Sequence, residues 1–92
     1  LALDGSIIGH VGDGNFHTNI MVTPEQYDQA SAFAEDIVKR ALALGGTATG
    51  EHGIGLVKRK FMEEEHGPAL DWMRQLKQLF DPANILNPGK IL

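Results

Sequence analysis

The stretch that decides the fold runs from residue 6 to residue 22 and reads SIIGHVGDGNFHTNIMV. Two apolar runs, residues 6–10 and 16–22, flank a glycine-rich segment. An Asp-Gly pair between apolar runs is typical of a tight β-hairpin. If Asp13-Gly14 forms a two-residue turn, His10 lies directly opposite His17, and both side chains share one face. A slip of one residue would separate them.

The segments that follow the hairpin predict helices and one further strand. Residues 23–26 (Thr-Pro-Glu-Gln) have the pattern of a capped helix start, and Gly45 is placed to end that helix. Beyond it we expect a third strand at residues 46–51, a short charged helix at 56–65 and a last helix between Gly67-Pro68 and Asp81-Pro82.

Apolar side chains recur at helical spacing in the first and last helices, and we expect both sets to be core. They are Tyr27, Ala30, Ala34, Ile37, Val38 and Ala41 in the first helix, and Ala69, Trp72, Met73, Leu76, Leu79 and Phe80 in the last.

This order of elements predicts an α+β fold, in which helices pack on one face of a small antiparallel sheet. Three strands make a thin sheet whose edges need partners, which is compatible with strand exchange or a homo-oligomer. The sequence starts at Leu1 rather than Met and opens inside a predicted strand. We therefore expect a fragment of a longer protein.

Length and composition exclude several classes of protein. The 92 residues suffice for one small domain, and the net charge of −4 argues against a nucleic-acid partner. The absence of cysteine excludes disulfides and thiolate metal sites. No apolar run reaches membrane-spanning length and no signal peptide is evident. We expect a cytoplasmic protein, or one peripheral to the inner membrane at full length.

Candidate ligand-binding residues gather in two glycine-rich segments. Residues 5–14 and 45–55 hold nine of the eleven glycines, and His10, His17 and His52 lie in or beside these two segments. Backbone so rich in glycine, next to polar side chains, is typical of close approach to a ligand. His10 and His17 can converge on a metal ion, with Glu51 as the natural third ligand. The spacing also allows a pair of ordinary surface or capping histidines.

Two further side chains fit roles beside such a metal. Asn19, two residues past His17, shares its strand face. His52 would point away from Glu51 in an extended chain and could then act as a proton acceptor. His66 is interpreted as a helix-boundary residue. No P-loop, dinucleotide-binding motif or nucleophile elbow is present.

Three motifs in the chain carry a family resemblance. Residues 9–17, GHVGDGNFH, resemble the G-H-x-G-D-G-N-x-H motif of the FAD-linked oxidase C-terminal domain family. Residues 50–55, GEHGIG, are similar to its second motif, and residues 81–90 resemble its chain ending. The family includes D-lactate dehydrogenases, the flavin subunit of glycolate oxidase and D-2-hydroxyglutarate dehydrogenases.

The resemblance implies a flavoprotein like vanillyl-alcohol oxidase. An N-terminal domain, outside these 92 residues, binds FAD, and a ferredoxin-like cap domain covers the substrate. Residues 1–92 would form the end of that cap and the C-terminal helices that return to the flavin domain. Further arginine and lysine residues that hold the substrate carboxylate are expected upstream.

The resemblance also assigns roles to individual residues. His10, His17 and Glu51 match metal ligands, with zinc or manganese as the metal. His52 matches the base and Asn19 a substrate contact.

Asn87, in the tail motif, is expected to approach the flavin. The implied reaction oxidises a D-2-hydroxy acid to the 2-oxo acid by hydride transfer to flavin, and the fragment alone would be inactive. The electron acceptor stays open among a quinone, a cytochrome and an electron-transfer flavoprotein. The alternatives are a metal-dependent hydrolase and a non-catalytic assembly piece whose glycines serve only turns.

Overall fold

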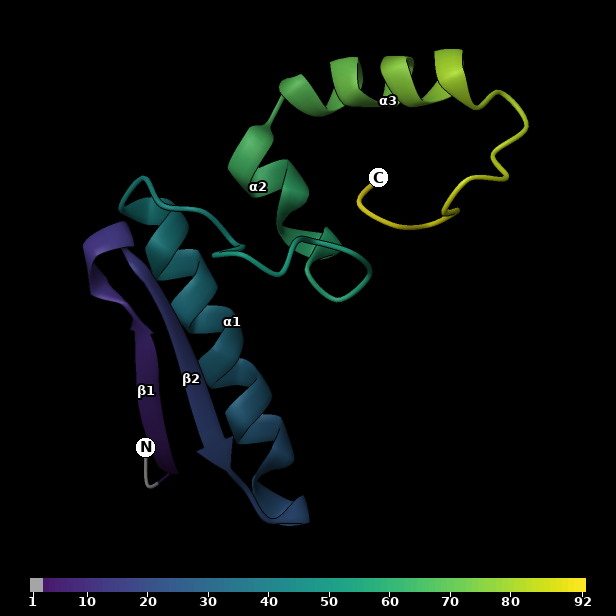
Figure 1. The fold of residues 1–92 in the computed structure, drawn as a ribbon. Coiled ribbons are helices and arrows are strands. Elements are labelled where there is room, and N and C mark those ends of the chain that lie inside the picture. The colour runs from purple at the N-terminus through teal and green to yellow at the C-terminus, as the bar shows by residue number, and fades with distance from the viewer. Residues whose placement is uncertain (1–2) are drawn as a thin grey trace. The chain divides into compact units, whose positions relative to one another are not determined.

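The computed structural model describes residues 3–92, which fall into two compact units, residues 3–46 and 47–92 (Figure 1). The first unit contains β1 (Asp4–His10), β2 (Asn15–Met21) and α1 (Tyr27–Ala43). The second contains α2 (Met62–His66) and α3 (Ala69–Phe80). Single 3-10 turns lie at Val11–Asp13, Pro24–Gln26 and Arg59–Phe61. The α+β class is confirmed. Among residues 3–92, no helix is both long and apolar enough to cross a bilayer.

The antiparallel hairpin forms as expected, but its register differs from the prediction. His10 pairs with Asn15, and His17 pairs with Ile8. The connection is a 3-10 turn closed by the Gly14 N–H, which donates to the Val11 carbonyl at 3.1 Å. This turn is longer than the two-residue turn that the Asp-Gly pair predicts, so the pairing shifts by two positions.

The shift leaves the functional face intact. Successive residues of a strand point to opposite faces, so a displacement by two residues changes the partners and keeps the face. His10 and His17 are therefore diagonal neighbours, for which Cα separations of roughly 7–8 Å are usual. They share a face, as predicted, without being directly opposed.

Close contact between the two strands explains a glycine in β1. A Cβ built on Gly9 would lie 2.2 Å from the Asn15 carbonyl oxygen and 2.5 Å from the Phe16 Cα. Both neighbours are backbone atoms and cannot move aside without opening the hairpin. Glycine is therefore a steric requirement at this position.

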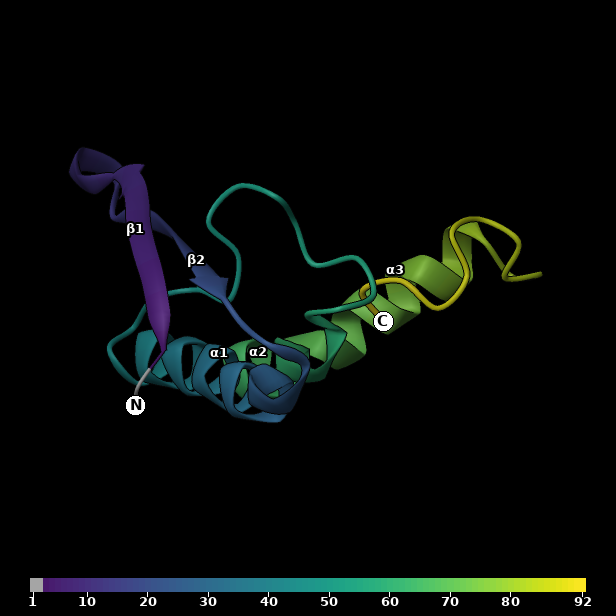
Figure 2. The same ribbon diagram turned by 90° about the horizontal axis from the view of Figure 1, so that it is seen from below.

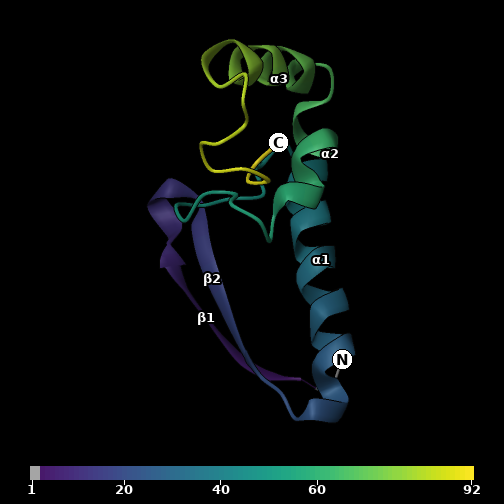
Figure 3. The same ribbon diagram turned by 90° about the vertical axis from the view of Figure 1, so that its right-hand side faces the viewer.

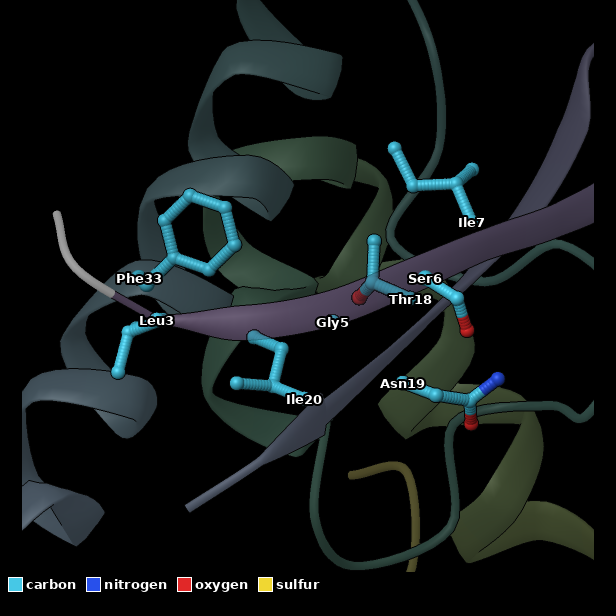
Figure 4. A pocket seen from close by; sticks show the side chains of 8 residues that line it. All are labelled: Leu3, Gly5, Ser6, Ile7, Thr18, Asn19, Ile20 and Phe33. Atoms are coloured by element: carbon cyan, nitrogen blue, oxygen red, sulfur yellow. The ribbon is translucent and has the colours of Figure 1, made fainter.

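The α1 helix packs beside the hairpin (Figures 2 and 3). Phe33 of α1 lines a cavity together with Thr18 and Ile20 of β2 (Figure 4). Thr18 and Ile20 alternate with His17 and Asn19 along the strand and point to the opposite face, although Ser6 and Asn19 also line this cavity.

Both ends of α1 are specified locally, as predicted. The Thr23 N–H donates to Gln26 Oε1 at 3.2 Å, which is half of a capping box. At the other end the Gly46 N–H donates to the Ala41 carbonyl at 2.7 Å, while Gly45 takes a φ of +83°. This is a Schellman ending, in which glycine provides the left-handed residue.

The apolar helix faces form, but they are only partly covered. In α1, Tyr27 and Ala34 are exposed, and the other predicted core positions are half-buried. In α3, Trp72 is 70% exposed, and Leu76, Leu79 and Phe80 are exposed as well. The prediction that these side chains are core is therefore wrong for the described residues, because neither unit has enough structure to cover them.

The predicted third strand is absent from the second unit. Residues 46–51 form bends instead, and their polar groups are satisfied by side chains rather than by a strand ladder. Threonine hydroxyls compete in this way with regular structure. The short helix expected at 56–65 is reduced to a 3-10 turn and α2, whereas the last helix is confirmed as α3.

Candidate functional site

One face of the hairpin carries a row of polar side chains. It comprises His10 from β1 and Asn15, His17 and Asn19 from β2. His17 and Asn15 are half-buried, while His10 and Asn19 are exposed. The strand alternation that points Ile20 toward the cavity lined by Phe33 of α1 sets all of these side chains on the opposite face.

Asn15 is a residue that sequence reasoning missed. Its Oδ1 atom is buried and has no hydrogen-bond partner among the described residues. A buried acceptor without a donor is costly, and in native proteins it usually marks a place for water, an ion or a ligand. The available signal was its position inside the GDGN stretch, two residues before His17 and on the same face.

Asn19 lies further along the same row. It pairs across the strands with Ser6, and Figure 4 shows these two polar side chains together, away from Phe33. The hairpin therefore offers an amide and a hydroxyl within reach of a ligand that lies along this face. The predicted position of Asn19 beside His17 is confirmed.

Glu51 and His52 form a second polar group. The Glu51 Oε1 atom lies 3.7 Å from His52 Nε2, and the two side chains are 50% and 73% exposed. The expectation that they point in opposite ways is wrong, because residues 50–52 bend and the chain is not extended. The bend is closed by the Gly53 N–H, which donates to Thr49 Oγ1 at 2.8 Å.

The tail of the second unit is organised by a buried carboxylate. Asp81 is 6% exposed and accepts hydrogen bonds from the N–H groups of Ile85 and Leu86, both at 3.0 Å. Lys77 forms an ion pair with Asp81 and also donates to the Leu86 carbonyl at 2.6 Å. The Lys77 ammonium, together with the two N–H groups, holds the pKa of Asp81 below its usual 3.8, although burial acts in the opposite direction.

Asn87 follows this turn. It is exposed, with a φ of +43°, and lines an open cavity with Phe80 and Gly55. The Ile91 N–H donates to the Gly55 carbonyl at 2.8 Å. The tail motif and the end of the GEHGIG motif thus meet within the second unit, which their separation in sequence does not reveal.

The predicted site residues therefore fall into defined groups. His10, His17 and Asn19 share one face in the first unit. Glu51 and His52 adjoin in the second, where Asn87 lies at a separate cavity. Imidazole and carboxylate are donors that suit zinc, and the buried acceptor of Asn15 adds a polar group beside the histidines. The donor chemistry fits the expected metal.

Comparison with known proteins agrees with the three motifs. Residues 1–91 match the family model described as FAD linked oxidases, C-terminal domain. The chain is 51% identical over 94 residues to the probable mitochondrial D-lactate dehydrogenase of Danio rerio, covering 98% of this chain and 19% of that protein.

Two other relatives show the same pattern. The mitochondrial D-lactate dehydrogenase (cytochrome) 1 of Saccharomyces cerevisiae is 50% identical, with 97% of this chain and 16% of that protein covered. The glycolate oxidase subunit GlcD of Bacillus subtilis is 48% identical, with 90% and 18% covered. The chain spans about a fifth or less of the length of these relatives. It belongs to the family of C-terminal domains of FAD-linked oxidases.

Proposed function

We propose that this chain is the metal- and substrate-binding end of a flavoenzyme that oxidises a D-2-hydroxy acid to the 2-oxo acid. The observation that carries the proposal is the polar hairpin face, which presents His10, His17 and Asn19 together. Family membership supports an FAD cofactor. We propose that FAD is bound mainly by an N-terminal domain of the intact protein.

The substrate class follows from shared chemistry. The relatives are named for D-lactate and for glycolate, which are both 2-hydroxy acids. Such a substrate offers a hydroxyl and a carboxylate oxygen on adjacent carbons, and both are good ligands for a divalent cation. D-lactate, glycolate and D-2-hydroxyglutarate are the candidates.

Each site residue has a chemical role in this proposal. His10, His17 and Glu51 would hold a zinc or manganese ion, which lowers the pKa of the α-hydroxyl when bound. The His52 imidazole accepts the hydroxyl proton, and the Asn19 amide donates a hydrogen bond that orients the substrate.

Bound FAD would supply the two-electron acceptor for the α-hydrogen, so that, with the proton taken by His52, the acid would lose two electrons and two hydrogens in all. Asn87 is the residue of this chain that we propose approaches the flavin. The exposed apolar face of α3 around Trp72 would pack against the FAD-binding domain.

The test is anaerobic reduction of the intact flavoprotein. D-lactate, glycolate and D-2-hydroxyglutarate are each mixed with the enzyme while the absorbance of oxidised flavin is followed, with L-lactate as the matched control. We expect one of the three acids to bleach the flavin, a chelator to prevent this, and zinc or manganese to restore it. An intact protein that none of the three acids reduces would overturn the proposal.

A further inference from the structure

A half-buried carboxylate supports the loop that carries Glu51 and His52. Glu65, near the end of α2, has a side chain that is only 15% exposed. Its oxygens accept the Thr47 hydroxyl, with both distances 3.0 Å, and the Ala48 N–H at 2.5 Å. The His66 Nε2 atom lies 3.0 Å from Glu65 Oε2. We call these four residues the Glu65 clamp.

The clamp satisfies a buried part of the chain. Ala48 is 5% exposed, so its N–H needs a protein acceptor, and the Glu65 carboxylate provides one. The half-buried Glu65 carboxylate in turn loses part of its hydration and accepts hydrogen bonds from the Thr47 hydroxyl and the Ala48 N–H. The hydrogen bond from the Ala48 N–H to Glu65 satisfies both groups, and it joins segments that are 17 residues apart in sequence.

A relay of hydroxyls extends from the clamp around Glu51 and His52. The Thr47 hydroxyl, held by Glu65, also receives the Thr49 N–H at 3.4 Å. The Thr49 hydroxyl in turn receives the Gly53 N–H at 2.8 Å. Residues 50–52 lie between these two anchors and form bends rather than a helix or strand. Their conformation therefore depends on side-chain contacts that begin at Glu65.

We infer that Glu65 is a positioning residue, which fixes the loop that presents Glu51 and His52 without itself contacting substrate or metal. The inference rests on the proposed function, because it assumes that Glu51 and His52 act there. It explains why a carboxylate is half-buried at this point of α2, while the neighbouring Glu63 and Glu64 are exposed.

The test compares Glu65→Ala and Glu65→Gln with Glu64→Ala in the intact flavoprotein. We expect Glu65→Ala to lower kcat at least tenfold and to weaken zinc affinity by about 10–100-fold, as loss of an outer support does at metal sites. FAD content stays at the wild-type level. Glu65→Gln keeps an acceptor for the Ala48 N–H and is expected to restore part of both losses. Glu64→Ala, exposed on the same helix, behaves as wild type.

Hydrogen exchange separates this inference from the proposed function. Glu65→Ala should speed amide exchange at residues 48–53 relative to Glu64→Ala, whether or not the protein oxidises a hydroxy acid. A wild-type enzyme inactive on every acid would refute the function alone. Unchanged exchange, or faster exchange with wild-type kcat and zinc affinity, would overturn the positioning role. If Glu65→Ala does not fold, Thr49→Val decides by the same measurements, since it leaves Glu65 in place.

Discussion

The hairpin and the loop at residues 47–53 present their polar side chains by different means. In the hairpin, a ladder of backbone pairs between β1 and β2 decides which residues face the ligand. In the loop no ladder exists, and the Glu65 carboxylate with two threonine hydroxyls holds the bend. A side-chain substitution outside the ligand set should therefore be tolerated in most of the hairpin and damaging in the support of the loop.

The largest effect is expected where the hairpin itself is sterically closed. Gly9→Ala places a methyl group against the Asn15 carbonyl and the Phe16 backbone. We expect a destabilisation of about 3 kcal/mol, seen as a lower urea midpoint of the intact protein. Gly12→Ala is the control, because no atom lies within 4 Å of the added Cβ. Equal midpoints for the two variants would contradict the tight packing of the strands.

The next effect concerns the neighbouring residues Glu51 and His52. If His52 is the base, His52→Gln should lower kcat about 10²–10⁴-fold and leave zinc content unchanged. Glu51→Gln should lower both kcat and zinc content, because it removes a charged ligand. Metal analysis beside steady-state kinetics makes the distinction. Loss of zinc in both variants would show that the two residues do not divide the roles as proposed.

The tail offers a test in which pH matters. The pKa of Asp81 is depressed in the folded state, so its contribution to stability is present above the unfolded value of 3.8 and is lost as pH falls through the lower folded value. Asp81→Asn should lower the melting temperature at neutral pH, and the difference from wild type should shrink below about pH 4. Asp71→Asn, which removes an exposed pair with Arg74, should change stability by about 1 kcal/mol or less.

The smallest expected effect on the protein is that of a disulfide cross-link, which distinguishes the two possible registers of β1 and β2. Ile7 faces Thr18 in the structure, whereas a two-residue turn would place Ile7 opposite Ile20. The chain has no cysteine of its own. The double variant Ile7→Cys, Thr18→Cys should therefore form a disulfide under mild oxidation. Directly paired strand positions hold their Cα atoms at a separation that lets the two sulfur atoms bond. Faster cross-linking of Ile7→Cys with Ile20→Cys would support the other register.

Local patterns in the sequence were sufficient for the elements that depend on neighbouring residues. The capped start of α1, its glycine ending and the course of α3 are all decided within a few positions, and all three predictions are confirmed. The shared face of His10 and His17 was also predicted correctly, although the pairing was not. Side chains alternate between the two faces of a strand, so an error of two positions in the pairing still places His10 and His17 on the same face.

Contacts between distant residues were not predictable in this way. The strand expected at residues 46–51 is replaced by bends because Glu65, 17 residues beyond Ala48, takes the N–H that a ladder would use. No periodicity marks that carboxylate among its neighbours Glu63 and Glu64. The meeting of the tail with Gly55 is likewise set by packing in the second unit rather than by any local signal.

The turn between β1 and β2 has a consequence for insertions and deletions. Changing its length by two residues moves His17 along β1 but leaves it on the face of His10, whereas a change by one sends either histidine to the side of Ile20. The turn must therefore keep an even number of residues, whereas its absolute length can change. Natural length variation between the two histidines should then come in pairs of residues, or in single residues offset by a bulge.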